Sequence, residues 1–219
     1  VMVFLSKVAN LMILNVLTII CCIPIFTAGA AITALYYVTI KMARGDDPYI
    51  VKGYFKSFKE NFKQATILWL LVLLVVAVYV GDILIFSYSG MQFPKVLVVA
   101  VIAIAVLAAM VVVYIFPLLA RFDNTVWNTL KNAALMAFLN LPKTILMVVV
   151  YALPLVIAYF STYSIIFVIM FGYSVPAYIA AWLYSGIFKK FEPEVETTSD
   201  LEFTVTMDGG KEEEDGKSE

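Results

Sequence analysis

The feature that most constrains this chain is a series of apolar runs, each long enough to cross a lipid bilayer. The clearest runs are Ala65–Tyr88 and Lys95–Ala120, in which charged residues are rare. At about 1.5 Å of rise per residue, a helix over either run is longer than the roughly 30 Å hydrocarbon core of a bilayer. Backbone groups in hydrocarbon must hydrogen-bond within the protein, so these runs predict transmembrane helices.

The composition of the 219 residues agrees with this interpretation. Apolar residues make up 63% of the chain and charged residues 14%, whereas globular domains carry about 45–50% and ~25%. The mean hydropathy is +0.95. These values exclude an ordinary soluble domain, a disordered protein and a nucleic-acid-binding protein.

We predict an all-α fold: a polytopic helical membrane bundle with six, alternatively five, transmembrane helices and a cytoplasmic amphipathic helix. A helix over Thr27–Ala43 would be only about 25 Å long, so it either crosses on a thinned or tilted path or re-enters. Pro154 and Pro176 lie inside the last two spans and predict kinks. The predicted membrane domain is 1–188, with spans at about 8–26, 27–43, 65–88, 95–120, 144–160 and 165–188.

Residues 49–63, between the second and third large spans, carry two helical stripes. One stripe is apolar and largely aromatic and the other is basic, and each repeats every three or four residues. The stripes are Val51, Phe55, Phe58 and Phe62, and Lys52, Lys56, Lys59 and Lys63. This pattern is typical of a helix at a bilayer surface, where rings enter the acyl boundary and lysines reach anionic headgroups.

Basic residues are distributed unevenly between the predicted loops. In the six-span arrangement twelve of them share one side of the membrane, against Lys95 alone on the other. The positive-inside rule therefore predicts a multi-pass protein of the cell membrane with those twelve residues and both termini in the cytoplasm. A re-entrant Thr27–Ala43 would move only Lys7 to the other side, so charge does not decide between five and six spans.

The predicted second region, 189–219, differs sharply from the membrane domain. After Lys190 the chain carries eleven acidic and two basic residues. Such a segment cannot bury enough apolar surface to offset the entropy of ordering it. We therefore predict an acidic, disordered cytoplasmic tail.

The sequence predicts no catalytic, cofactor-binding or metal site. It contains no histidine, which removes Ser-His-Asp triads, Cys-His pairs and His-based metal sites. The two cysteines, Cys21 and Cys22, are adjacent within an apolar run and are interpreted as packing residues. We therefore predict a protein that is not an enzyme and needs no cofactor.

Two polar residues are candidate membrane-embedded sites. Asp82 lies inside an apolar run, where burying a carboxylate costs about 2.5–3.5 kcal/mol on insertion scales. It is either a proton or ligand site facing a polar cleft, or an interfacial residue that bonds locally near Tyr88. Asn15 lies in the first predicted span, and the alternative to a site is a hydrogen bond between helices.

A candidate docking surface combines the basic stripe with a second predicted cytoplasmic segment. That segment contains Arg121-Phe122-Asp123-Asn124, for which an exposed helix cap with a local ion pair is the alternative. The surface consists of Lys52, Lys56, Lys59, Arg121 and Asp123.

Three stretches of the sequence resemble one family. They are Asn15–Arg44 (NVLTIICCIPIFTAGAAITALYYVTIKMAR), Tyr54–Leu70 (YFKSFKENFKQATILWL) and Ile115–Thr125 (IFPLLARFDNT). The chain resembles the YesL-like family of uncharacterised bacterial membrane proteins over roughly residues 5–188. The resemblance supplies no catalytic residue, and it implies a context of uptake and breakdown of plant-type oligosaccharides.

These observations predict a non-enzymatic accessory or regulatory membrane protein linked to carbohydrate uptake. Its expected partners are the lipid bilayer and subunits of a carbohydrate importer, with no nucleic acid. A small membrane transporter or channel is the alternative, and it would require polar residues that face one another across the bilayer.

The predicted orientation can be tested by cysteine labelling in a background lacking Cys21 and Cys22. A cysteine at Gly90 should react with an impermeant thiol reagent from outside the cell, and one at Gly53 should not. Labelling in the opposite sense would invert the topology. A cysteine at Thr27 should label from outside if six helices cross, and only from inside if 27–43 re-enters.

Overall fold

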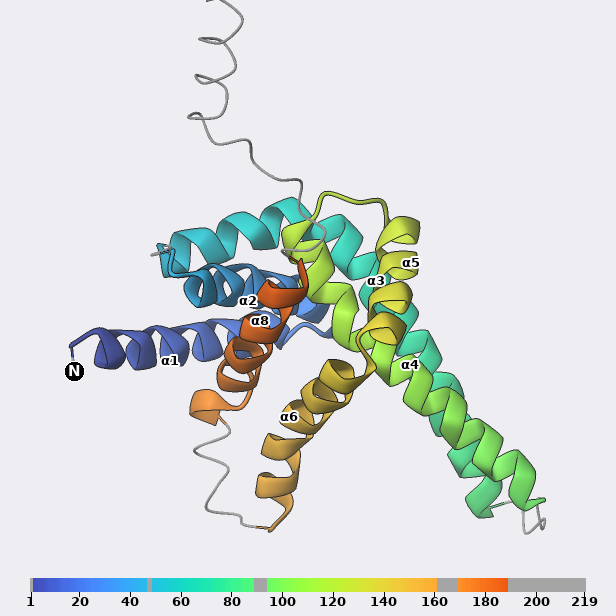
Figure 1. Cartoon of the computed structure of the whole chain (residues 1–219). Helices are drawn as coiled ribbons and strands as arrows, with labels where there is room; N and C mark the ends of the chain where they lie inside the picture. The colour runs from blue at the N-terminus through green and yellow to red at the C-terminus, as the bar shows by residue number, and fades with distance from the viewer. Residues whose placement is uncertain (1, 47–48, 89–93, 161–168, 189–219) are drawn as a thin grey trace, which may run out of the picture. The chain divides into compact units, whose positions relative to one another are not determined.

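A computed structural model describes residues 2–46, 49–88, 94–160 and 169–188. Every regular element in these ranges is helical, which confirms the predicted all-α class. The chain divides into two compact units, Val1–Gly186 and Ile187–Glu219, and the predicted acidic tail lies outside the described residues. The elements are α1 (Met2–Cys22), η1 (Ile25–Thr27), α2 (Ala28–Arg44), α3 (Ile50–Tyr88), α4 (Lys95–Arg121), α5 (Val126–Leu139), α6 (Leu141–Phe160) and α8 (Ser174–Phe188) (Figure 1).

Helix α2 forms the core of the first unit. Most of the segment Ile25–Arg44 is buried inside the protein, 72% of its most apolar 18-residue stretch, and α2 packs against α1, α3 and α4. Its first half is rich in small residues, including Ala28–Ala31 and Ala34, all of which are buried. Small side chains let neighbouring helices approach closely, which is the usual means of packing helices in hydrocarbon.

The closest approach between α2 and α3 occurs at Gly29. A Cβ atom added there would lie 2.5 Å from the carbonyl oxygen of Ala65 and 2.6 Å from the Cβ of Trp69. The indole nitrogen of Trp69 donates a 2.7 Å hydrogen bond to the carbonyl of Ile25, just before α2. The lack of a side chain at Gly29 and the hydrogen bond from Trp69 therefore fix the position of α3 along α2.

The chain turns between α1 and α2 near the boundary between the first two predicted spans. Helix α1 ends at Cys22, four residues before the predicted end of the first span, and Pro24 precedes the short 3₁₀ helix. The hydroxyl of Thr27 donates to the carbonyls of Cys21 and Pro24, at 2.5 and 2.7 Å. The bond to Cys21 satisfies a carbonyl group that the end of α1 leaves without a helical partner.

One continuous helix, α3, takes the place of two predicted ones. The surface helix expected over 49–63 and the span expected over 65–88 are joined in a single helix of 39 residues. Lys63, Gln64 and Ala65 are good helix formers, and no glycine or proline separates the two parts, so nothing interrupts the backbone. At about 58 Å, this helix is nearly twice as long as the hydrocarbon core is thick.

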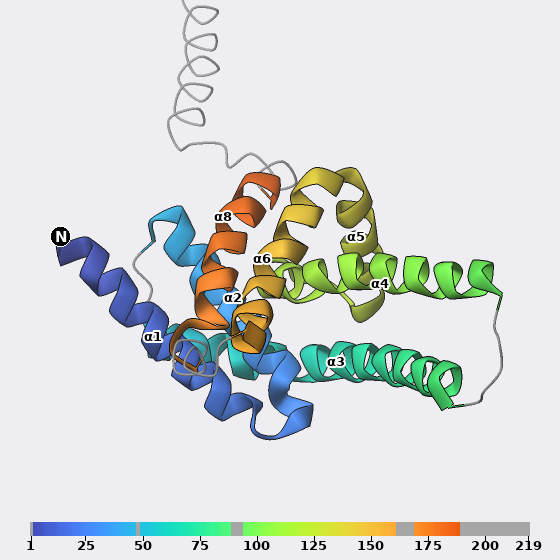
Figure 2. The same cartoon turned by 90° about the horizontal axis from the view of Figure 1, so that it is seen from below.

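The apolar parts of α3 and α4 run side by side and extend away from the other helices (Figures 1 and 2). In Figure 1 the cyan first third of α3 crosses the top of the view, and the teal and green remainder descends beside α4. Only 6% of the apolar window in each helix is buried. A helix that exposes apolar side chains all round is suited to hydrocarbon, so this pair supports a membrane location.

The last predicted span is interrupted, at a position that the sequence analysis did not identify. Within the predicted span 165–188, the described residues 169–171 are helical, a turn follows at Gly172–Tyr173, and α8 then begins at Ser174. Pro176, expected to kink a continuous helix, lies instead in the first turn of α8. A proline costs little there because the first N–H groups of a helix have no helical partner.

Five described helical segments are long and apolar enough to cross a membrane: Leu5–Cys22, Ile25–Arg44, Ile50–Tyr88, Lys95–Arg121 and Leu141–Tyr159. Several such helices indicate a multi-pass membrane protein. The choice between five and six spans, the cytoplasmic placement of 49–63 and the orientation of the termini stay predictions.

Substitution by alanine should have opposite effects on stability at Gly29, which lies in close contact with α3, and at Gly81, which has open space around it. Gly29→Ala should destabilise the protein by about 1–3 kcal/mol, because the new methyl group meets α3 backbone that cannot move alone. Gly81→Ala should stabilise it by about 0.5–1 kcal/mol, because a Cβ there meets nothing within 4 Å and alanine favours the helix. Thermal unfolding in detergent measures both, and equal shifts in Tm would contradict the predicted contact.

Candidate functional site

Asn15 bridges α1 and the interrupted helix before α8. Its side-chain oxygen accepts hydrogen bonds from the backbone N–H groups of Tyr173 and Ser174, at 2.9 and 2.8 Å. Its side-chain nitrogen donates a 2.6 Å bond to the carbonyl of Ile169. Asn15 is fully buried, so these three bonds form without water.

The interrupted helix explains why a polar residue is buried at this point. A break in a helix frees carbonyl groups before it and N–H groups after it, and hydrocarbon offers them no partner. An amide supplies one acceptor and one donor group, so Asn15 can serve both sides of the break. The hydroxyl of Ser174, at the same place, is buried and has no hydrogen-bond partner among the described residues.

A second polar cluster consists of tyrosines from four helices. The hydroxyl of Tyr36 on α2 donates a 2.6 Å hydrogen bond to that of Tyr151 on α6, and the Tyr151 and Tyr184 hydroxyls also interact. Tyr184 on α8 donates to the carbonyl of Val113 at 2.6 Å. The rings of Tyr36 and Tyr114 each pack edge-on against Tyr184, with centroids 5.9 and 5.4 Å away.

The sequence analysis did not identify this cluster as a site. Tyr114 and Tyr151 each lie well inside an apolar run rather than at its end. That position was the available signal, because transmembrane tyrosines usually gather at the interfaces, where their hydroxyls reach water. Tyr114 also shares a 3.1 Å hydrogen bond with the hydroxyl of Thr144.

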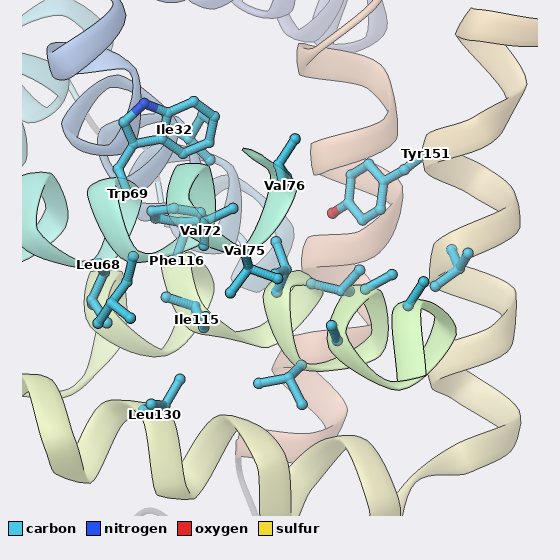
Figure 3. A pocket seen from close by; sticks show the side chains of 18 of the residues that line it. Ile32, Leu68, Trp69, Val72, Val75, Val76, Ile115, Phe116, Leu130 and Tyr151 are labelled. Atoms are coloured by element: carbon cyan, nitrogen blue, oxygen red, sulfur yellow. The ribbon is translucent and has the colours of Figure 1, made fainter. Parts of the chain in front are cut away.

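An apolar cavity of about 690 Å³ lies beside the tyrosine cluster. Residues of α3 and α4 form most of its wall. The wall is completed by two residues of α2, one of α5 and two of α6: Ile32, Tyr36, Leu130, Val148 and Tyr151. Figure 3 shows Tyr151 extending from α6 into the space that the α3 and α4 side chains border. Nearly all of the lining is aliphatic or aromatic, so the cavity suits an apolar guest.

Asp82 and Asn15, the two predicted membrane-embedded residues, have different surroundings. Asp82 is half-buried near the far end of α3 and forms no hydrogen bond or ion pair with the described residues. No polar cleft joins it to Asn15 in the part of the chain that the structure describes. The structure therefore gives Asn15 a defined set of partners and gives Asp82 none.

The predicted docking residues are all exposed. Lys52, Lys56 and Lys59 lie on the side of α3 opposite Tyr54 and Ser57, which are buried. Lys56 is 3.9 Å from Glu60 in an exposed pair one helical turn away, and such pairs contribute little stability. The lysine face of α3 therefore stays accessible to a partner.

The aromatic stripe beside the lysines is only partly exposed. Val51 and Phe55 are exposed, whereas Phe58 and Phe62 are half-buried. The rings of Tyr54 and Phe58 stack with centroids 6.4 Å apart. The residues that actually attach this part of α3 to the protein, Tyr54 and Ser57, were not singled out in the sequence.

Arg121 and Asp123 flank the end of α4. Arg121 is its last residue, and both side chains are exposed. The residue that caps the next helix is Thr125, whose hydroxyl accepts a 3.4 Å hydrogen bond from the N–H of Asn128. Neither Arg121 nor Asp123 is this cap.

Cys21 and Cys22 are half-buried free thiols. Among the described residues no group of three or more Cys, Asp or Glu side chains is placed to hold a metal ion.

Loss of the Asn15 side chain should lower the stability of the protein more than loss of Asn10, the other asparagine of α1. Asn15→Leu leaves three buried backbone groups unpaired and should cost at least about 1 kcal/mol. Asn10→Leu is a matched control, because Asn10 is half-buried on the same helix and has no hydrogen bond to the described residues. The Tm in detergent should fall clearly for Asn15→Leu only, and similar values for the two variants would refute the bridge.

Comparison with known proteins gives two matches. Residues 11–83 match a family described as "Protein of unknown function, DUF624". The uncharacterized protein YesL of Bacillus subtilis (strain 168) is 28% identical over 148 residues, which cover 66% of this chain and 69% of the relative. No solved structure matches the chain.

The matched region 11–83 contains α2 and both sides of its contact with α3, so the match covers the core of the fold rather than one peripheral helix. Neither matching description states an activity. The two matches confirm the resemblance to the YesL-like family of uncharacterised proteins that the sequence indicated.

Proposed function

We propose that this chain is a non-enzymatic accessory or regulatory membrane protein that docks onto carbohydrate import machinery. The docking surface is the one formed by Lys52, Lys56, Lys59, Arg121 and Asp123. The observation that carries the proposal is the exposed lysine face of α3, which the protein's own packing leaves open.

The attachment of α3 supports a rigid docking surface. Tyr54 and Ser57 are buried on the opposite side of the helix. A Cβ atom added at Gly53 would lie 3.8 Å from side-chain atoms of Tyr37 and Val38 on α2, so the two helices are in contact there. The lysines are therefore presented by a helix that is packed against the core. Rigid presentation lowers the entropy that binding must overcome.

Charge supports a partner with an acidic surface. Three lysines on one face attract acidic groups and raise the rate of association, an effect that salt screens. Arg121 and Asp123 add one charge of each sign at the end of α4, and a mixed pair of this kind favours one orientation of the partner. The carbohydrate importer as partner follows from the family resemblance.

The proposal can be tested with two triple variants in native membranes. Reversal of Lys52, Lys56 and Lys59 to Glu should reduce crosslinking and co-purification of importer subunits by at least about tenfold, because three attractive contacts become repulsive. Replacement of the same lysines by Arg keeps the charge and should preserve capture. Both variants should insert normally, since these side chains lie outside the apolar runs.

Two outcomes would overturn the proposal. One is equal capture by the Glu and Arg variants. The other is that no importer component is captured by any variant while the purified protein moves solute across liposomes, which would establish the transporter alternative.

A further inference from the structure

The length of the apolar cavity matches one leaflet of a bilayer. On α3 its lining runs from Leu68 to Tyr79, and on α4 it runs from Ala105 to Phe116. Each stretch covers eleven residue steps, or roughly 16 Å along a helix. The hydrocarbon core is ~30 Å thick, so the cavity extends through about half of it.

The chemistry of the wall favours a hydrocarbon chain. The lining between α3 and α4 is formed mostly by aliphatic side chains, and an apolar wall suits an apolar guest. Two polar groups of the wall have partners within the protein, since the Tyr36 hydroxyl donates to that of Tyr151 and the Trp69 indole N–H donates to the carbonyl of Ile25. A guest need not supply a polar group to either of them.

Basic residues follow the cavity at one end. Arg121, the last residue of α4, follows Phe116 by five residues and lies about 7–8 Å further along the helix. Lys131 is adjacent to the lining residue Leu130. Both bases are exposed, and cations near the membrane surface attract anionic headgroups.

We propose that this cavity binds one acyl chain of an anionic phospholipid, drawn from the leaflet whose headgroups lie level with Arg121 and Lys131. The chain fills the space between α3 and α4, and the phosphate remains at the basic end. The inference is separate from the docking proposal, because it uses the cavity rather than the lysine face of α3.

Trp69 provides a probe, because it lines the cavity. The other two tryptophans, Trp127 and Trp182, are outside the lining and exposed, so replacing both with Phe leaves Trp69 as the single fluorophore. The protein is reconstituted in unlabelled phosphatidylcholine. A small fraction of one probe lipid with brominated chains is added, either phosphatidylglycerol or phosphatidylcholine. Bromine quenches tryptophan on contact, so quenching at low probe fractions reports occupancy of the cavity.

Brominated phosphatidylglycerol should quench Trp69 with an apparent affinity about fivefold higher than brominated phosphatidylcholine, as expected for one added cation–anion contact. Ala109→Phe places a ring in the cavity and should remove this preference. Ala103→Phe is the matched control, because Ala103 is exposed on α4 but does not line the cavity. It should retain the preference.

Equal quenching by the two lipids in the single-tryptophan protein would overturn the proposal, and this comparison does not depend on how any cavity variant folds. An undiminished preference in Ala109→Phe would also overturn it, because the lipid would then bind elsewhere. Loss of importer capture by the lysine variants leaves both results unchanged, so the two proposals fail separately.

Discussion

In hydrocarbon every backbone N–H and C=O group needs a partner within the protein, and this requirement explains the arrangement around Asn15. The turn at Gly172–Tyr173 interrupts a helix inside an apolar run. Asn15 supplies an acceptor to the N–H groups after the turn and a donor to the carbonyl of Ile169 before it. A side chain near the start of the chain therefore stabilises a break near its end, and α1 becomes a necessary part of the bundle.

The core around α2 follows from a second consequence of the same environment. Apolar burial gives little drive for helices to associate within lipid, so close packing and hydrogen bonds must do so. Gly29 allows α2 to touch the backbone of α3, and Tyr36 extends from α2 to bond with Tyr151. One helix thus supplies the close contact on one side and the polar contact on another, which accounts for its burial.

The helical class and the approximate positions of the apolar helices could be predicted because hydropathy and length determine them locally. The continuity of α3 could not, because the change from basic to apolar residues near Lys63 looks like a boundary although the backbone has no reason to stop there. The break at Gly172–Tyr173 was also missed. Pro176 is the stronger local signal, but a proline is accepted in the first turn of a new helix, and the compensating residue is 158 positions away from Tyr173.

In the candidate sites, too, features that depend on neighbouring residues could be predicted, and contacts between distant parts of the chain could not. Exposure of Lys52, Lys56 and Lys59 could be predicted, because a basic stripe on an amphipathic helix rarely packs inward. Asn15 could be recognised as a buried polar residue, but its partners belong to a distant helix. The tyrosine cluster joins four helices, so no single stretch of sequence contains its pattern.

The two proposed surfaces share α3 without competing for it. At about 100° per residue, Lys52, Lys56 and Lys59 lie roughly 180° around the helix from Leu68, Val72 and Tyr79. A partner on the lysine face would therefore leave the cavity open, and a lipid in the cavity would leave the lysines free. Helix α3 is continuous from Ile50 to Tyr88, but its contact with Gly29 lies at Ala65 and Trp69, between the lysines and most of the cavity lining. The same contact that fixes α3 against α2 therefore separates the two surfaces, so that docking and lipid occupancy are independent in position as well as in contact.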